Sequence, residues 1–150
     1  MTLVLVADPI ADEGLTVLRE HARVEDVSGD RAALERCIGE ADALLVRSET
    51  RVTAELLDRA PRLRVIGRAG AGVDTIDVTA ATARGIVVVN APGGNAVAAA
   101  EHALALMFSL ARHIPLADRL MKQGQWKRSQ LVGSELTGKT LGLVGLGRVG

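Results

Sequence analysis

The chain has 150 residues, with 18 basic and 18 acidic side chains, so its formal net charge at pH 7 is zero. The basic residues are scattered and form no stripe, which argues against a nucleic-acid partner. The first residues have no basic segment and reach Asp8 early, unlike a signal peptide. The longest apolar run, residues 96–111, is too short and too polar to span a bilayer. With Cys37 as the lone cysteine, the composition predicts a soluble cytoplasmic protein without disulfides or a membrane partner.

Short β-branched runs alternate with helical patterns over the first ninety residues. We expect strands at residues 3–7, 23–27, 43–46, 63–66 and 86–89. We expect helices at 11–21, 31–39 and 53–59, with a further short helix between Asp77 and Gly85. Thr53 and Asp77 suit N-caps, and Gly85 suits the residue after a helix end. Five β-α repeats at this spacing predict an α/β fold with a doubly wound parallel sheet.

The pattern changes after the fifth strand, and we expect a domain boundary near Asn95. Residues 90–95 are rich in turn formers. A long helix is expected over 97–113, and it is apolar on most of its circumference, so it needs cover on more than one side. Pro115 breaks it, a second helix runs to about Gln123, and a new strand is expected at 141–144. The sequence thus predicts a domain at 1–95 and the beginning of another at 96–150.

A glycine fingerprint closes the chain, directly after the last expected strand. Gly145, Gly147 and Gly150 follow the spacing G-x-G-x-x-G. In a dinucleotide site the first glycine makes a tight turn, the second lets the backbone approach a pyrophosphate, and the third allows close helix packing. The helix that should follow, and the acidic residue that should bind the ribose, lie beyond residue 150. The motif favours NAD binding, although chance glycine clusters are common.

A second glycine cluster, at Gly67, Gly70 and Gly72, follows the fourth strand. Glycines there let backbone N–H groups converge on a carboxylate or phosphate, although a plain strand-to-helix turn is the commoner reason for such glycines. Arg47 and Ser48 end the third strand in a comparable position. An arginine there can form paired hydrogen bonds with a carboxylate or phosphate, or it can be a solvated loop charge.

A receiver domain of the response-regulator type has the same five β-α repeats, and it belongs to a different functional class. It needs paired acids after the first strand, an aspartate after the third and a lysine after the fifth. This sequence has only Asp8, Arg47 and Asn90 at those places. The receiver hypothesis therefore fails at all three.

Five stretches taken together resemble the D-2-hydroxyacid dehydrogenase family, and most closely its phosphoglycerate branch. They lie in family order at residues 47–50, 67–77, 90–95, 100–106 and 145–150. The resemblance covers the whole chain. It implies a flavodoxin-like substrate domain up to about Asn95, followed by the truncated start of a Rossmann domain that binds NAD.

The resemblance also implies which residues bind ligands. The carboxylate and phosphate of a small phosphorylated 2-hydroxy acid would meet Arg47, Ser48 and the backbone amides of Gly70, Ala71 and Gly72. Ala71 would also lie near the nicotinamide. Arg128 would reach the active site of a partner subunit in a homodimer. The cofactor's pyrophosphate would meet a set of five residues at the end of the chain: Gly145, Gly147, Arg148, Val149 and Gly150.

No catalytic or metal-binding residue is expected within the chain. In the family an arginine, a glutamate and a histidine do the hydride chemistry, the histidine as general acid or base, and all three would lie beyond residue 150. His21, His102 and His113 match none of these positions. Glu49 is a departure, because some relatives carry a basic residue there. The chain is therefore expected to be an inactive, self-associating fragment of an NAD-dependent dehydrogenase.

Two alternatives stay open. A hydroxypyruvate or glyoxylate reductase of the same family would prefer an unphosphorylated 2-oxo acid. A non-catalytic binding or dimerising module would require that the reading frame stop after residue 150.

Overall fold

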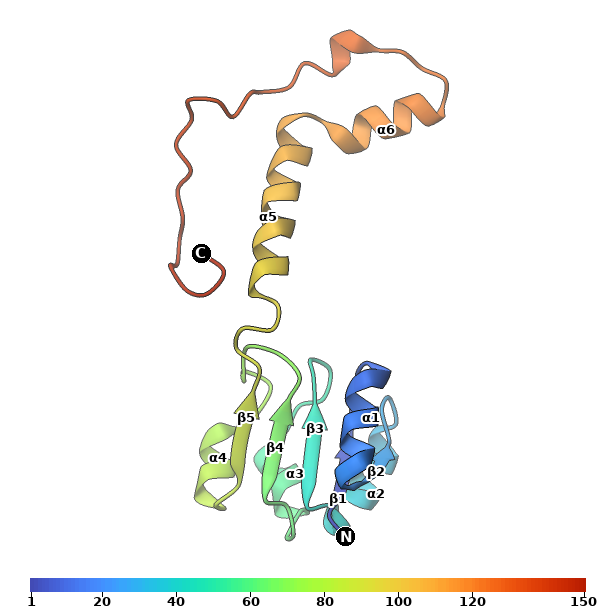
Figure 1. The fold of residues 1–150 in the computed structure, drawn as a ribbon, viewed down its shortest axis with the longest axis vertical. Helices are drawn as coiled ribbons and strands as arrows, with labels where there is room; N and C mark the ends of the chain where they lie inside the picture. Colours follow the sequence, from blue (N-terminus) through green and yellow to red (C-terminus); the bar gives the residue numbers. More distant parts are fainter. The chain divides into compact units, whose positions relative to one another are not determined.

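The computed structural model describes all 150 residues, and the chain divides into two compact units, Met1–Gly94 and Asn95–Gly150. The first unit is a five-stranded parallel sheet with helices (Figure 1). Its strands are β1 (Leu3–Val6), β2 (Arg23–Asp26), β3 (Ala43–Val46), β4 (Val65–Arg68) and β5 (Val87–Asn90). They lie in the order β2-β1-β3-β4-β5, which is the flavodoxin-like order with its switch point between β1 and β3. The predicted α/β fold is confirmed.

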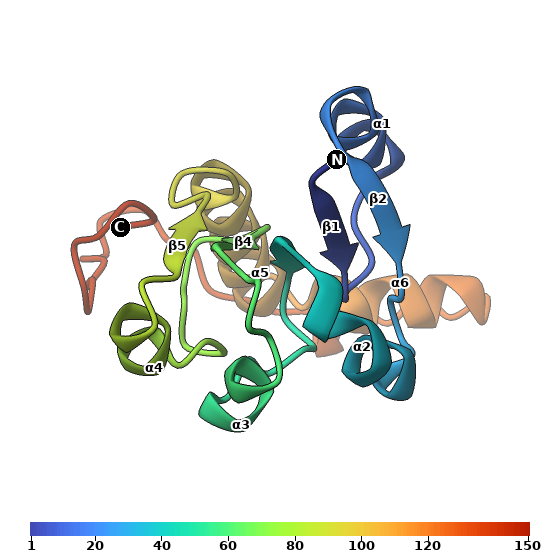
Figure 2. The same ribbon diagram turned by 90° about the horizontal axis from the view of Figure 1, so that it is seen from below.

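Helices cover the two faces of the sheet unequally. They are α1 (Asp12–His21), α2 (Arg31–Cys37), α3 (Ala54–Asp58) and α4 (Val78–Ala83). Figure 2 shows α1 on one face and α2, α3 and α4 on the other. The main core lies under those three helices, where Leu44 and Ile66 of the sheet meet Leu34 of α2 and Leu56 of α3. On the β5 edge strand, Val87 and Val89 stay 58% and 50% exposed.

The helix ends follow the capping residues expected from the sequence. The Thr53 side chain accepts a hydrogen bond from the Leu56 N–H, and the Asp77 side chain accepts one from the Ala80 N–H. Gly85 follows α4 with a φ of 68°, a left-handed conformation in which a side chain is strained. These caps satisfy helix N–H groups that have no partner within the helix.

The predicted fourth strand, 63–66, was placed two residues too early. Leu63 is buried, but its N–H donates to the Ala60 carbonyl and closes the turn after α3. Pairing with β3 begins only at Val65, opposite Ala43. A buried apolar residue is common to strands and to the turns that lead into them, so hydrophobicity alone misplaced the boundary.

The second unit consists of helices and irregular backbone. Helix α5 (Ala96–Ala111) is followed by α6 (Ile114–Lys122) and a short 3-10 turn, η2 (Arg128–Gln130). His113 separates the helices with a φ of 53°, and Pro115 occupies the first turn of α6, where its missing N–H costs nothing. No helix of the chain is both long enough and apolar enough to serve as a membrane span.

The predicted strand at 141–144 is wrong for this structure. These residues run without strand pairing, and their apolar side chains are exposed, with Leu141 at 59% and Leu143 at 54%. A strand forms only when a neighbour accepts and donates its backbone hydrogen bonds. The second unit contains no strand at all, so the apolar segment 141–144 has no neighbouring strand with which to pair.

Candidate functional site

The carboxyl ends of β1, β3, β4 and β5 bring four loops to one edge of the first unit. Because the strands are parallel, residues that follow Val6, Val46, Arg68 and Asn90 all lie at this edge. Ligands of open α/β sheets bind beyond the carboxyl ends of the strands. This edge also carries the substrate residues expected from the sequence, Arg47, Ser48 and 70–72, and we call it the carboxyl edge.

The loop 47–50 is held by a single buried carboxylate. Asp8 is 1% exposed and is the only buried charged residue of the chain. One carboxylate oxygen accepts the Arg47 N–H at 2.6 Å and the Glu49 N–H at 3.2 Å. The other accepts the Thr50 N–H at 3.0 Å and the Thr50 hydroxyl at 2.5 Å. A carboxylate so buried is stable only with such partners.

These hydrogen bonds also decide the ionisation of Asp8. Burial alone raises the pKa of the carboxyl, because it disfavours the charged form. The Thr50 hydroxyl and the backbone N–H groups of Arg47, Thr50 and Glu49 together outweigh burial, so the pKa lies below its ordinary value. Asp8 is therefore an anion at neutral pH, and both of its carboxylate oxygens accept hydrogen bonds from loop 47–50.

The backbone of Arg47 is also held from its other side. Its carbonyl oxygen accepts a hydrogen bond from Arg68 Nε at 2.9 Å. The Arg68 guanidinium then lies so close to Gly70 that a Cβ on Gly70 would be 2.6 Å from its terminal nitrogen. Glycine at position 70 thus leaves room for this arginine. The side chains of Arg47 and Ser48 stay exposed at the edge.

The glycine loop 70–72 is tied to β5 by two hydrogen bonds. The Asn90 side chain donates to the Ala71 carbonyl at 2.6 Å, and the Ala91 N–H donates to the Gly70 carbonyl at 2.9 Å. At Gly72, a Cβ would lie 2.6 Å from a carboxylate oxygen of Asp74. The structure therefore brings Arg47, Ser48, Gly70, Ala71 and Gly72 to the same edge on neighbouring strands. An arginine beside backbone amides of this kind can bind an anion.

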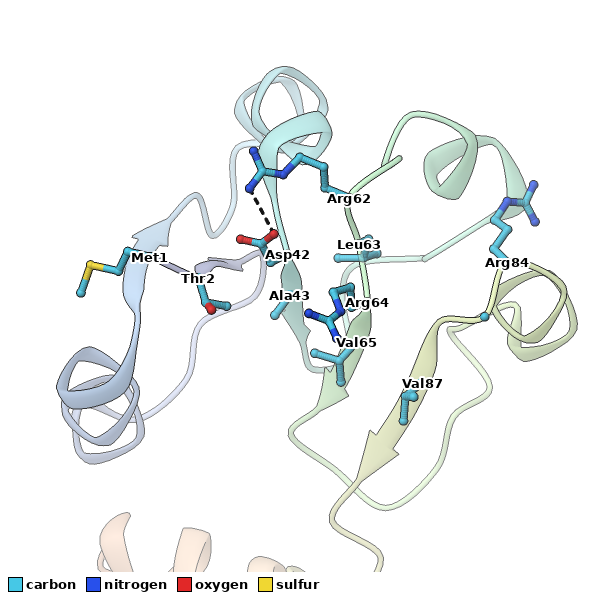
Figure 3. A pocket seen from close by; sticks show the side chains of 11 residues that line it. Met1, Thr2, Asp42, Ala43, Arg62, Leu63, Arg64, Val65, Arg84 and Val87 are labelled. Atoms are coloured by element: carbon cyan, nitrogen blue, oxygen red, sulfur yellow. Dashed lines mark hydrogen bonds and ion pairs between the residues drawn. The ribbon is translucent and has the colours of Figure 1, made fainter.

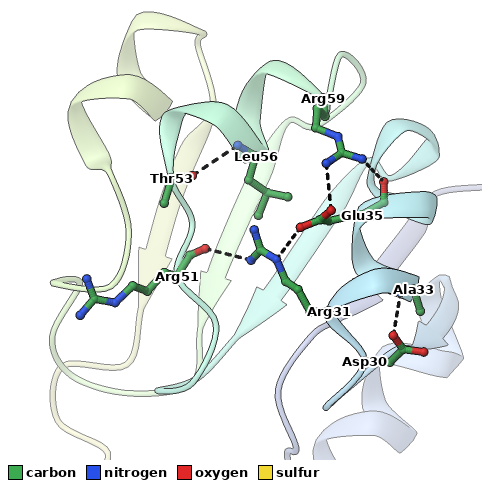
Figure 4. A network of polar contacts seen from close by, with 8 residues as sticks. All are labelled: Asp30, Arg31, Ala33, Glu35, Arg51, Thr53, Leu56 and Arg59. Carbon is green, nitrogen blue, oxygen red and sulfur yellow. Dashed lines mark hydrogen bonds and ion pairs between the residues drawn. The ribbon is translucent and has the colours of Figure 1, made fainter.

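A surface network anchors the chain just beyond loop 47–50 (Figure 4). Arg31 donates to Glu35 at 2.8 Å and reaches the Arg51 carbonyl at 3.5 Å. Arg59 of the turn after α3 donates to the other Glu35 oxygen at 3.0 Å. Hydrogen bonds from Arg31 and Arg59 hold the pKa of Glu35 below its ordinary value. The network links α2 to the segment that follows β3.

A large pocket of the first unit lies at the opposite edge of the sheet (Figure 3). It has a volume of about 770 Å³ and is lined by residues that precede the strands, among them Thr2, Asp42 and Arg64. Asp42 accepts the Leu3 N–H at 2.8 Å and pairs with Arg62 at 3.2 Å. The pocket is therefore remote from the loops of the carboxyl edge, and its size does not make it the candidate site.

The remaining site residues expected from the sequence lie in the second unit. Gly145 has a φ of 96°, and a Cβ on Gly150 would lie 2.5 Å from the Gly145 carbonyl oxygen, so both positions require glycine. Nothing lies within 4 Å of the position that a Cβ on Gly147 would take, which leaves its backbone open to a ligand. Arg148 and Val149 are exposed, and so is Arg128 in η2. No group of His, Cys, Asp or Glu side chains is placed to hold a metal ion.

Residues 4–142 match the family model for the catalytic domain of D-isomer specific 2-hydroxyacid dehydrogenases. This chain belongs to that family. It is 54% identical over 98% of its length to a D-3-phosphoglycerate dehydrogenase of Archaeoglobus fulgidus, and 49% identical over its whole length to one of Bacillus subtilis. It spans 28% and 29% of those two relatives. The family resemblance expected from the sequence is therefore confirmed.

Solved structures of other proteins agree with the family assignment. A Thermus thermophilus protein matches 99% of this chain with a TM-score of 0.90 at 37% identity, and the match covers 50% of that protein. The NAD-dependent formate dehydrogenase of Staphylococcus aureus, solved with NAD, matches 99% with a TM-score of 0.86 at 28% identity, again over 50% of its length. The chain thus corresponds to about half of each solved structure.

Three residues of the candidate site were not assigned a ligand-related role from the sequence. Asp8, Arg68 and Asn90 each hold the backbone of a loop that carries an expected ligand residue. Their position was a usable signal, because Arg68 and Asn90 are the last residues of their strands and Asp8 follows the end of β1 by two residues. Their partners were not readable, because Asp8 contacts residues 39 to 42 positions away in the sequence.

Proposed function

We propose that this chain is the N-terminal part of an NAD-dependent D-3-phosphoglycerate dehydrogenase of serine biosynthesis, a cytoplasmic enzyme. The full-length enzyme would oxidise the 2-hydroxyl of 3-phospho-D-glycerate to the ketone of 3-phosphohydroxypyruvate. In that reaction the C2–H bond would give its hydride to NAD⁺ and the hydroxyl group would give its proton to a base, so that NADH and H⁺ would be formed. The observation that carries the proposal is the identity of about half of all residues with enzymes of that name, along nearly the whole chain.

Unit Met1–Gly94 would bind the substrate at the carboxyl edge. Arg47 is exposed and can form paired hydrogen bonds with a carboxylate or phosphate. Ser48 would donate its hydroxyl, and the N–H groups of Ala71 and Gly72 would surround the rest of the anion. The Gly70 N–H, also expected to contribute, already donates to the Arg68 carbonyl at 2.8 Å. The hydrogen bonds to Asp8, Arg68 and Asn90 support this role, since they hold both loops before a ligand arrives.

Unit Asn95–Gly150 would begin the nucleotide domain, and its glycines fit NAD. The open backbone at Gly147 leaves room for a pyrophosphate, while Gly145 and Gly150 supply the turn and the close approach. Arg148 and Val149 would contact the pyrophosphate, and Ala71 would lie near the nicotinamide. When bound, NAD supplies the hydride acceptor. An acidic residue about 20 positions after these glycines would bind the ribose and select NAD over NADP.

The remaining catalytic groups would also follow residue 150. An arginine would orient the carboxylate, and a histidine paired with a glutamate would take the hydroxyl proton. Arg128 would extend from one subunit toward the active site of its partner in a homodimer. The exposed apolar side chains of α5 support an interface there, because Leu104, Leu106 and Phe108 are all about half exposed.

Steady-state kinetics of the full-length protein test the proposal. We expect NADH to form from 3-phosphoglycerate and NAD⁺. Arg47→Ala should raise the KM for the substrate more than the KM for NAD⁺, because it removes only a substrate contact. Gly147→Asp should weaken NADH binding in a fluorescence titration by steric and charge conflict. A full-length protein that neither binds NADH nor oxidises any 2-hydroxy acid would overturn the assignment.

Glu49 favours a second candidate within the family. Glu49 is exposed in the loop 47–50, and its carboxylate would repel a phosphate bound beside Arg47. A hydroxypyruvate or glyoxylate reductase has no such conflict. Competition between hydroxypyruvate and its 3-phosphate in the full-length protein distinguishes the two. A higher kcat/KM for the unphosphorylated acid would establish the reductase.

A further inference from the structure

We propose that Asp8 is a positioning residue for substrate binding, which fixes the backbone from which the Arg47 side chain projects. The inference rests on the function proposed above, and it assigns a role to a residue that contacts no expected ligand atom. Asp8 is buried at the end of β1, at the point between β1 and β3 where the strand order reverses. Three backbone N–H groups of loop 47–50 donate hydrogen bonds to it.

The hydrogen bonds define how the positioning works. The Arg47 N–H is held by Asp8 at 2.6 Å, and the Arg47 carbonyl is held by Arg68 at 2.9 Å. Both peptide groups that flank the Arg47 Cα are therefore held in place. A long arginine side chain that leaves a fixed backbone loses less freedom when it binds an anion. The loop needs no rearrangement before the substrate arrives.

The chemistry of the carboxylate is specific to this task. Asp8 faces four donors, three N–H groups and the Thr50 hydroxyl, and it accepts from all of them. An asparagine of the same shape has one amide nitrogen in place of an acceptor oxygen, so that nitrogen would face N–H donors. The loop would then have to move to relieve that conflict.

A purely structural role would make a different prediction. In that case Asp8→Asn lowers the melting temperature, but the folded enzyme binds its substrate as before. Asp42→Asn is a matched control, because Asp42 also accepts a backbone N–H, that of Leu3, and lies at the opposite edge of the same sheet. It tests the loss of a carboxylate–backbone bond without touching loop 47–50.

The decisive experiment compares full-length wild type, Asp8→Asn and Asp42→Asn by steady-state kinetics. For Asp8→Asn we expect the KM for 3-phosphoglycerate to rise on the order of tenfold, with the KM for NAD⁺ within about twofold of wild type. Asp42→Asn should leave both constants unchanged. Equal substrate constants in the two variants, or equal rises for both ligands in Asp8→Asn, would overturn the inference.

Thr50 provides a second pair of variants should Asp8→Asn fail to fold. Thr50→Val removes the hydroxyl that bonds Asp8 at 2.5 Å, and Thr50→Ser keeps it. We expect a smaller rise in the substrate KM for the valine variant and a return to the wild-type value for the serine variant. A valine variant that matches wild type in substrate KM would contradict the role of the network.

Hydrogen exchange separates failure of this inference from failure of the proposed function. In the full-length wild type, the amides of Arg47, Glu49 and Thr50 should exchange slowly, and in Asp8→Asn they should exchange faster by tenfold or more, on the order expected when a protecting bond is lost. This readout does not require turnover. If the protein oxidises no 2-hydroxy acid, the proposed function fails, while unchanged exchange in Asp8→Asn overturns the positioning itself.

Discussion

The two units of the chain use similar apolar residues with opposite results. In Met1–Gly94, Leu5, Leu44 and Ile66 are at most 1% exposed, because a paired sheet presents them to helices that share one core. In Asn95–Gly150, Leu120 is the only buried apolar residue, and none of the sixteen residues of helix α5 is buried. Apolar composition therefore does not make a core by itself. The apolar face of a helix or strand is buried only where another helix or sheet packs against it.

The largest expected effect comes from expressing the two units separately. Residues 1–94 should fold on their own and melt in one cooperative transition, because their sheet and core are internal. Residues 95–150 should show no cooperative transition, since they have no sheet and almost no buried apolar surface. Circular dichroism during heating measures both. A sharp transition in 95–150 alone would remove the contrast between the units.

Helix α5 should cause the 150-residue chain to self-associate. Leu106, Phe108 and Leu110 are 56%, 51% and 79% exposed, and an apolar surface of this kind gains free energy when it is covered by another molecule. Phe108→Glu should shift the chain toward monomer in sedimentation velocity at tens of micromolar. Glu101→Gln, at an exposed polar position of the same helix, serves as the control and should not. A monodisperse monomer in the wild type would refute the expectation.

Shortening one apolar side chain should cost far more stability in the first unit than in the second. Leu44→Ala should lower the free energy of unfolding by about 2–5 kcal/mol, because it leaves a cavity in the core under α2 and α3. Leu106→Ala should lower it by no more than about 0.5 kcal/mol in the monomer, since that side chain is already half exposed. Urea unfolding monitored by circular dichroism gives both values. Similar losses would mean that α5 is packed as tightly as the sheet.

Asp8 should make the first unit sensitive to acid. Its folded pKa lies below the unfolded value of about 3.9, so the stabilisation is present above that pH and is lost as the pH falls through the folded pKa. Asp8→Asn should lower the free energy of unfolding at neutral pH by about 1–3 kcal/mol and flatten its decline below pH 4. Urea titrations at a series of pH values test this. If the free energy of unfolding of Asp8→Asn fell as steeply below pH 4 as that of the wild type, the acid sensitivity would come from other carboxylates.

The smallest effect is expected at Glu35, although it has two arginine partners. Its pairs with Arg31 and Arg59 lie on the surface, with half of each arginine side chain exposed, and solvent screens such pairs. Glu35→Gln should change the melting temperature by less than Asp8→Asn does. The difference from wild type should disappear at high salt. A change as large as that of Asp8→Asn would show that the surface network matters more than the buried carboxylate.

The sequence predicted most of the first unit because its signals are local. Thr53 and Asp77 cap helices within three residues, and Gly85 ends a helix through its own backbone conformation. The start of β4 was misplaced because the hydrogen bond between Leu63 and Ala60 competes with the strand, and hydrophobicity does not report that bond. At the candidate site, the sequence predicted roles for Arg47 and for the loop 70–72, and the structure brings these residues to the same edge of the sheet. It did not identify Asp8, whose partners are distant along the chain.

What the sequence determined by itself is therefore the parallel α/β class, the family and the approximate places of the helices and strands in the first unit, because periodicity, caps and motif residues are contiguous. Only the tertiary structure decided which residues hold the Arg47 backbone, because that depends on β1 lying beside β3. It also decided that 141–144 is no strand, since a strand exists only where a neighbour completes its hydrogen bonds.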